Sequence, residues 1–433
     1  MTSRHPSTTT SRGALRHSLW LFVCLIALSA HTQTPATTAP LTLFELLNNA
    51  SQFYPALQAA RVEARASSED TAAIRRQRWP TMSVISESHT GNVRSVPSSA
   101  LQVQQTLWDF GRLSSRIEEV GTLEQISEIN IHLQQQEVFL QVIAAWQNLL
   151  TSQARVRVAL TTLARLQAYQ AQMRRRVEAE ASPRIDLELV DARLLQTEVE
   201  RTTAQTSLQV ALIRLEQLTG LTQLPSRLHA TPPLADIQEA ATFAKRTQNT
   251  DWQSVAMHSP LVAKAQAQLR QAQHKLDGKK SESFPQVYVR AYKPLNTIAT
   301  SQDTSPTAFV GLSYNPGAGL STYAEAQALG TRITSAQLAI ESARLEVQQS
   351  LQSEHEELVN ARLRMSAIQK AVEGSELVLA SYKRQFEAGK KNWLDVLNAV
   401  RELAQNQYNQ ADTRGQLMGA MYRLQLRMGS FTE

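Results

Sequence analysis

The sequence of 433 residues contains one pattern twice. Near the start of the pattern, Pro55 and Pro80 are repeated by prolines 205 residues later, and several residues between them match in the same register. Near its end, Asp186 and Gly220 are repeated by the same residue types 209 residues later. The two offsets, 205 and 209 residues, differ by only four inserted residues. This agreement predicts a duplicated structural unit.

Each copy predicts the same order of elements: a helix, two strands and two helices folded back on each other. The first helix of each copy ends at an aromatic residue followed by proline, which is a helix stop. The strand segments are rich in β-branched and aromatic residues and are bounded by turn residues. The predicted helices are 42–78 and 251–283, and the predicted strands are 82–85, 101–110, 287–292 and 308–314.

The two helices that follow the strands are long. Glycine and proline number only 15 each, and aromatic residues make up 6% of the chain, which is typical of long helices. Apolar residues such as Val142, Trp146 and Leu149 recur in steps of three and four, the spacing of a coiled coil. A helix from Gly111 to Arg176 would extend on the order of 100 Å, more than a compact domain allows. We expect a mainly α fold with a small β part, built from the duplicated helix–two strands–long helical hairpin unit. The predicted divisions are repeat 1 at 42–220, a linker at 221–250 and repeat 2 at 251–430.

The N-terminus predicts export from the cytoplasm. A basic stretch without acidic residues precedes the apolar run Leu19–Leu28, and Ala27 and Ser29 fit a small-x-small cleavage site. We therefore expect a signal peptide at 1–29 and an extension at 30–41. An uncleaved anchor helix is the alternative. Cys24, the only cysteine, lies in the apolar run; its lipidation is a further alternative.

The composition argues against enzymes and nucleic-acid binding. Removal of residues 1–29 leaves 41 basic and 38 acidic residues, so the charge gives no reason to expect nucleic acid. No His, Cys or carboxylate cluster has catalytic spacing. His355-Glu356 lacks the second histidine of a zinc-protease helix. We expect no catalytic residues, no metal and no cofactor.

The strands suggest a membrane barrel shared between chains. Leu101, Val103 and Leu107 alternate with polar residues, which predicts a two-faced strand. The two copies supply four strands, too few to close, and an open sheet edge is not tolerated in lipid. A barrel would therefore require an oligomer. Trp108 and Phe110, or else Tyr288 and Tyr292, would form an aromatic girdle at the membrane surface or be part of the core.

Several segments resemble the TolC family of outer-membrane efflux and secretion channels. They are Leu43-Phe44-Glu45, Tyr54-Pro55-Ala56-Leu57, Gln104 to Arg112, Gln217 to Gly220 and Leu394 to Ala399. The resemblance implies a homotrimer with a coiled-coil α-barrel in the periplasm and a shared transmembrane β-barrel in the outer membrane. It also implies a role as the exit duct of a tripartite export system, with a periplasmic adaptor protein and an inner-membrane pump as partners. The cargo is either protein, as in type I secretion, or small molecules. The alternative is a periplasmic coiled-coil scaffold or adaptor without a barrel.

The resemblance also places functional residues at the two hairpin turns. It implies a pore constriction formed by Asp395, Asn398 and Asp186, with Asn398 standing where the family has a second acidic residue. The alternative role for Asp395 is to stabilise the N-terminus of its helix. Both turns are basic, which suggests adaptor docking; a solvated helix end is the alternative. The docking candidates are Arg174, Arg175, Arg176, Glu180, Phe386, Gly389, Lys390, Lys391 and Trp393.

Overall fold

A computed structural model describes residues 42–88, 97–222, 224, 234–296, 305–315 and 317–430. The chain divides into two compact units, Met1–Ala39 and Pro40–Glu433, and every described residue belongs to the second unit. The predicted signal peptide, the N-terminal extension and Cys24 lie outside the described residues, as does the middle of the predicted linker.

The first repeat contains four helices and two strands. Short α1 and α2 lead into two strands, which are followed by a helical hairpin with a very long first arm. The elements are α1 (Leu43–Phe53), α2 (Pro55–Arg76), β1 (Thr81–Ser88), β2 (Pro97–Trp108), α3 (Arg112–Glu178) and α4 (Arg184–Thr219).

The second repeat has the same order, preceded by one more helix. Its elements are α5 (Leu234–Arg246), α6 (Trp252–Met257), α7 (Pro260–Ser281), β3 (Gln286–Asn296), β4 (Thr307–Ser313), a short 3-10 turn (Ala318–Leu320), α8 (Ser321–Glu387) and α9 (Trp393–Arg427). Both α3 and α8 have 67 residues, and both α2 and α7 have 22. The predicted fold class is confirmed.

Three details of the helix predictions are wrong. The helix predicted over 42–78 is broken at Tyr54, because Pro55 has no N–H to continue α1 and instead begins α2. Pro260 divides α6 from α7 in the same way. The segment predicted as a linker contains α5, whose Phe243 is buried in the core.

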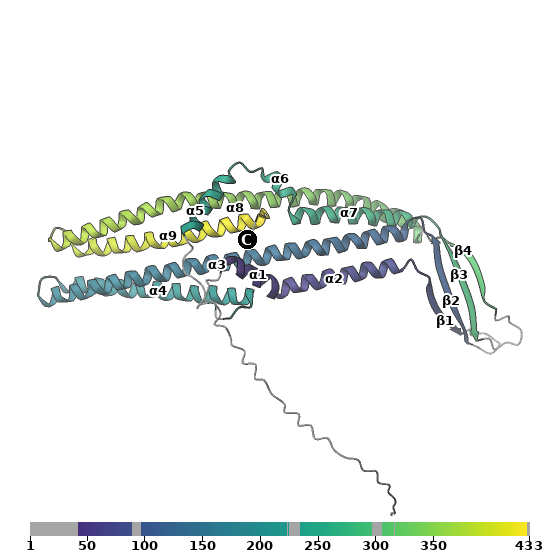
Figure 1. Cartoon of the computed structure of the whole chain (residues 1–433), viewed down its shortest axis with the longest axis horizontal. Coiled ribbons are helices and arrows are strands. Elements are labelled where there is room, and N and C mark those ends of the chain that lie inside the picture. Colours follow the sequence, from purple (N-terminus) through teal and green to yellow (C-terminus); the bar gives the residue numbers. More distant parts are fainter. Residues whose placement is uncertain are drawn as a thin grey trace, which may run out of the picture. The chain divides into compact units, whose positions relative to one another are not determined.

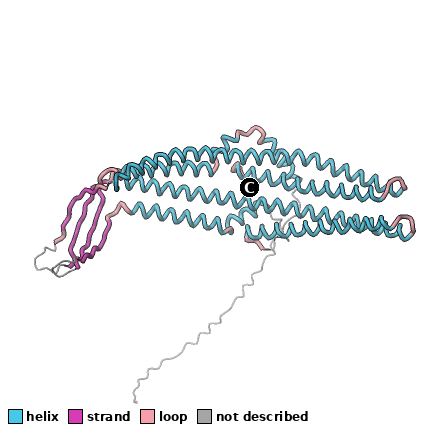
Figure 2. The backbone as a smooth tube through the Cα atoms, turned by 180° about the vertical axis from the view of Figure 1, so that it is seen from behind, coloured by secondary structure: helices cyan, strands magenta, loops and turns pink. Residues whose placement is uncertain are grey.

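The four strands form one antiparallel sheet in the order β1-β2-β3-β4. The helices connected to these strands lie side by side in the matching order α2, α3, α7, α8 (Figure 1). The sheet therefore continues into a layer of helices at one end, while the turns α3–α4 and α8–α9 lie together at the other end (Figure 2). Each long helix packs along its hairpin partner, and α3 also packs against α9.

The main core lies midway along the helices, where α1, α5 and α6 cover the two hairpins. Here Gly415 and Gly419 let α9 approach α3 closely. A Cβ atom at Gly415 would lie 2.2 Å from Thr151 Oγ1, and one at Gly419 would lie 1.9 Å from Gln147 Oε1. Among the described residues, no helix is long and apolar enough to cross a membrane.

Candidate functional site

The sheet has one apolar face and one polar face. Strand register pairs Met82 with Val103 and Val103 with Ala291, so these side chains share a face. The same register continues this apolar face to Val289 and Val310. The opposite face also includes Ile85 and Ala100, but it carries mainly polar and aromatic side chains, namely Thr81, Ser83, Gln102, Gln104, Thr106, Gln286, Tyr288, Arg290, Tyr292, Thr307 and Phe309. The alternation predicted for the second strand is confirmed.

Exposed aromatic side chains mark the helix end of every strand. Trp79 precedes β1, Trp108 ends β2, Phe284 precedes β3 and Tyr314 follows β4, and all four are more than half exposed. Phe110 stacks on Phe284 with ring centroids 5.0 Å apart. This aromatic belt resembles the girdle that borders an apolar band in membrane proteins.

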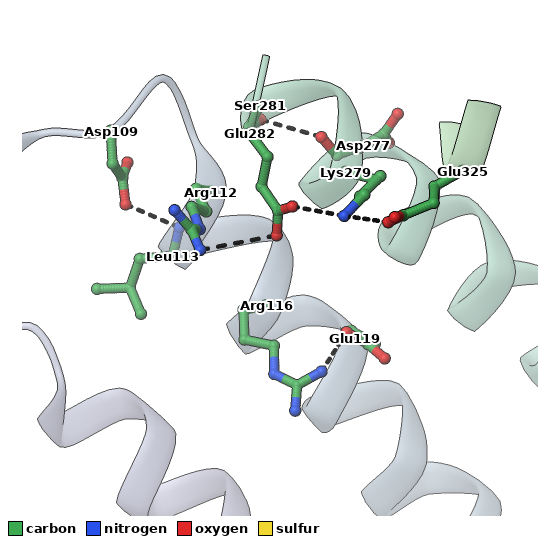
Figure 3. A network of polar contacts seen from close by, with 10 residues as sticks. All are labelled: Asp109, Arg112, Leu113, Arg116, Glu119, Asp277, Lys279, Ser281, Glu282 and Glu325. Atoms are coloured by element: carbon green, nitrogen blue, oxygen red, sulfur yellow. Dashed lines mark hydrogen bonds and ion pairs between the residues drawn. The ribbon is translucent and has the colours of Figure 1, made fainter. Parts of the chain in front are cut away.

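A network of ion pairs connects α3, α7 and α8 next to the aromatic belt (Figure 3). Arg112 on α3 reaches Glu282 at 3.7 Å, and Glu282 pairs with Lys279 at 2.7 Å. Lys279 also pairs with Glu325 of α8. Hydrogen bonds to Glu282 and Glu325 raise the pKa of Lys279, and the hydrogen bond from Lys279 lowers the pKa of Glu325. The network therefore links α3, α7 and α8.

A cavity of about 910 Å³ lies beside this network. The sheet residues that line it, Thr81, Thr106 and Gln286, all belong to the polar face. Asp109, also in the lining, accepts hydrogen bonds from the backbone N–H groups of Gly111 and Leu113 and so holds the start of α3. The cavity therefore opens on the polar side of the sheet.

At the far end, the two hairpin turns have the same backbone conformation. Glu180, two residues beyond the end of α3, has a φ of 54°, and Gly389, two residues beyond the end of α8, has a φ of 70°. The N–H of the residue after each one donates to a carbonyl five residues earlier at 2.8 Å. This is the Schellman arrangement, in which a left-handed residue closes the helix. The repeat thus preserves the turn although Glu180 and Gly389 differ.

Aromatic packing at the turns joins the two hairpins. Trp393 is 3% exposed, and its ring lies 5.5 Å from that of Tyr169 and 4.9 Å from that of Phe386. The Arg176 guanidinium lies 4.9 Å above the Phe386 ring. Of the docking candidates, Phe386 and Trp393 are therefore buried and hold the tip together.

The polar residues of the second turn organise the start of α9. Asn392 accepts the hydrogen bond from the Asp395 N–H at 2.9 Å, so Asn392 is the cap and Asp395 lies in the first helical turn. The Asp395 carboxylate lies 3.5 Å from Lys391. Asn398 is half-buried one turn later. The side chain that caps α9 is therefore that of Asn392, and Asp395 lies in the first turn, where a carboxylate is favoured near the helix N-terminus.

The first turn differs in its polar contacts. Pro183 replaces the capping side chain, and Arg176 donates to Ser182 Oγ at 3.1 Å. Burial raises the pKa of Asp186, while nearby Arg176 opposes that shift. Arg174 and Arg175 are exposed, as are Glu180 and Lys390. The exposed part of the tip is therefore mostly basic.

Sequence reasoning missed the ionic contacts between distant helices. Arg155 on α3 holds Asp412 on α9 by two hydrogen bonds of 2.7 and 2.5 Å, which raise the pKa of Arg155. Arg423 on α9 is bonded to Glu354 and Glu357 on α8. Helical spacing places each side chain on a face, but it does not identify a partner on another helix.

Metal-ligating residues do not cluster in the part of the chain that the structure describes. No group of three or more His, Cys, Asp or Glu side chains in that part is placed to hold a metal. His355 is buried and packs with its ring 5.1 Å from that of Trp252.

The comparisons with known proteins agree with this architecture. Residues 46–221 match the family described as outer membrane efflux protein. The matched segment corresponds closely to the first repeat. Together with the fold, this confirms the resemblance to the TolC family. No curated protein matches the sequence.

Solved structures match over nearly the whole chain. The channel protein CusC has a TM-score of 0.78 and 15% identity, over 89% of this chain and 91% of its own. The outer membrane protein VceC of Vibrio cholerae has a TM-score of 0.76 and 13% identity, over 89% and 96%. The MtrE outer membrane channel of Neisseria gonorrhoeae has a TM-score of 0.73 and 15% identity, over 90% and 89%. At these identities the likeness shows the fold.

Proposed function

We propose that this protein is the subunit of an outer-membrane channel and forms the exit duct of an export system. The observation that carries the proposal is the two-faced sheet, which has only four strands and stands at the end of a layer of long helices. Strands β1 and β4 each pair on one side only within the described sheet. In lipid these two edges would need partners.

Copies of the chain would supply those partners. Closed membrane barrels have about eight strands or more, so two or more copies are needed, and the family resemblance favours three. The apolar face with Met82, Val103 and Val310 would then contact lipid, and the aromatic belt would lie at the membrane surface. The polar face would line the lumen.

The helices would extend the lumen into the periplasm. At about 1.5 Å per residue, the 67 residues of α3 reach roughly 100 Å from the sheet to the tip. The tip would then contain the constriction, with Asp395, Asn398 and Asp186 as its lining. A ring of carboxylates at this position would favour cations over anions.

The exposed basic residues of the tip would dock a periplasmic adaptor, which connects the duct to an inner-membrane pump. Arg174, Arg175 and Lys390 are exposed. The buried aromatic residues Phe386 and Trp393 would fix the position of the turns that carry these cations. Cross-linking from Lys390 in living cells, followed by identification of the captured protein, tests this docking. Capture of no periplasmic partner, while a control site on the barrel captures its neighbour, would contradict it.

The family description favours efflux, and the sequence from Lys390 to Asn398 favours type I protein secretion. Gene deletion followed by drug-susceptibility and secreted-protein assays separates these cargo classes. Sensitivity to drugs with normal secretion would exclude the secretion role, and the reverse result would exclude efflux.

Fractionation tests the channel itself against the scaffold alternative. A channel subunit is recovered in the outer membrane and needs detergent for extraction. The purified protein should then produce discrete conductance steps in a planar bilayer. Recovery in the soluble periplasm without detergent would contradict the channel and favour a periplasmic scaffold.

A further inference from the structure

Arg290 occupies the centre of the polar face of the sheet in a fixed position. The strand register places Gln104 directly opposite it on β2 and Phe309 directly opposite it on β4. Its Nε and Nη2 atoms both donate hydrogen bonds to Gln104 Oε1, at 3.0 and 2.7 Å. The guanidinium lies 5.0 Å from the Tyr288 ring centre and 5.7 Å from that of Phe309. Two aromatic rings and an amide thus hold one cation.

Glycine makes this arrangement possible. Gly311 pairs with Tyr288 across β3 and β4, and a Cβ atom at Gly311 would lie 2.4 Å from Tyr288 Cζ. The Tyr288 ring therefore lies across the space that a side chain at position 311 would fill. In that position the ring supports the Arg290 guanidinium from one side.

Arg290 forms no ion pair with a carboxylate among the described residues. It is the only charged side chain on the polar face among the strand residues whose side chains the structure describes. Gln104 is neutral and uses two of the five N–H donors of the guanidinium. The other three donors make no hydrogen bond to any described residue. A fixed guanidinium with free donors is a suitable group for binding small anions.

We propose that Arg290 forms a ring of positive charge inside the barrel and makes this part of the lumen selective for anions. The inference rests on the proposed function, because the ring exists only if copies of the chain close a barrel with the polar face inward. Each copy then contributes one guanidinium at the same height. Rings of Arg or Lys select anions in other pores.

The size of the effect follows from simple electrostatics. Three unit charges would lie on the order of 10 Å from the axis, and at ~0.1 M salt this distance is about one Debye length. With that screening, the charges change the local concentration of each ion about twofold. Anions rise and cations fall, so the ratio of anion to cation permeability changes about fourfold.

The test measures the reversal potential of the full-length protein in a planar bilayer under a KCl gradient. Arg290→Gln should lower the chloride-to-potassium permeability ratio about fourfold, and Arg290→Lys should retain most of it. Gln102→Glu should lower the ratio as well, because it adds a compensating negative charge on the same face while keeping Arg290. Lys293→Gln is the matched control, since it removes one positive charge from the same strand on the apolar face.

The outcomes separate the inference from the proposed function. A wild-type protein that forms no channels would contradict the channel proposal. Channels whose permeability ratio is the same in Arg290→Gln and Gln102→Glu as in wild type would overturn the role of Arg290. An equal fall in Lys293→Gln would also overturn it, because the effect would then come from general charge. If Arg290→Gln fails to assemble, Gln102→Glu carries the test.

Discussion

Replacement of Arg423 by glutamine should destabilise the protein much more than the same change at its repeat equivalent, Arg214. The two arginines stand 209 residues apart, the spacing of the repeat. Arg423 is bonded to Glu354 at 2.8 Å, to Glu357 at 2.9 Å and to the amide of Gln147 at 2.8 Å. Arg214 makes one bond, to the amide of Gln141 at 2.8 Å. Only the second repeat therefore joins three helices through this position.

Burial sets the magnitude of the difference. The side chains of Arg423 and Glu354 are 16% and 14% exposed, whereas that of Glu357 is 41% exposed. Removing one partner of a buried ion pair costs about 3–5 kcal/mol, while an exposed pair contributes about 1 kcal/mol or less. Because Glu354 keeps a second contact with Arg427 at 3.9 Å, we expect Arg423→Gln to cost about 2–3 kcal/mol.

The assay is thermal unfolding of the detergent-solubilised protein, followed by far-UV circular dichroism. Arg423→Gln should lower the melting temperature by roughly 2–4 °C. Arg214→Gln should change the free energy of unfolding by about 0.5 kcal/mol or less, as is usual for surface substitutions. Similar melting temperatures for the two variants would refute the assignment of the stabilising role to the carboxylates around Arg423.

The hairpin turns give three further predictions. Asp395→Ala should raise single-channel conductance in a planar bilayer and weaken block by divalent cations; unchanged values would limit Asp395 to stabilising the start of α9. Glu180→Gly should stabilise the first turn by about 1 kcal/mol, because glycine adopts positive φ without strain. Gly389→Ala should destabilise the second turn by a similar amount for the same reason. Melting temperatures that shift in the opposite directions would contradict this. Burial raises the pKa of Asp186 above its ordinary value of 3.8, so the folded chain binds that proton more tightly than the unfolded chain and loses stability as pH rises through the raised pKa. Asp186→Asn should therefore reduce the loss of stability as pH rises through that raised pKa, and identical pH profiles of melting temperature for variant and wild type would exclude this role for Asp186.

The fold followed from the sequence to a large extent because local signals and the duplication agree. The helix predicted from Gly111 to Arg176 agrees with α3 almost to its last turn, and the Trp79-Pro80 pair marked the end of the first helical region. The break at Tyr54 was missed because a periodic apolar pattern continues through Pro55. Helix α5 was missed because Pro225, Pro232 and Pro233, which precede it in the sequence, are typical of a linker.

The functional residues were less predictable, because their roles depend on contacts between elements. Arg290 has no sequence signature. Its importance appears only when the register places Gln104 and Phe309 beside it. The turn residues were located by the repeat, but the side chain that caps α9 is Asn392 and not Asp395. Competition between neighbouring polar side chains for one backbone N–H is decided by geometry.

The closely matched lengths of the long helices in the two repeats make the hairpins a molecular ruler. Helices α3 and α8 each have 67 residues, and α4 and α9 have 36 and 35. One inserted residue in one arm would advance it by about 1.5 Å and rotate it by about 100°, which would place the two turns at different levels and turn their apolar stripes away from each other. The length of the two hairpins can therefore change only in coordinated steps. Removing one heptad from each of the four arms would shorten them by about 10 Å while keeping both turns level.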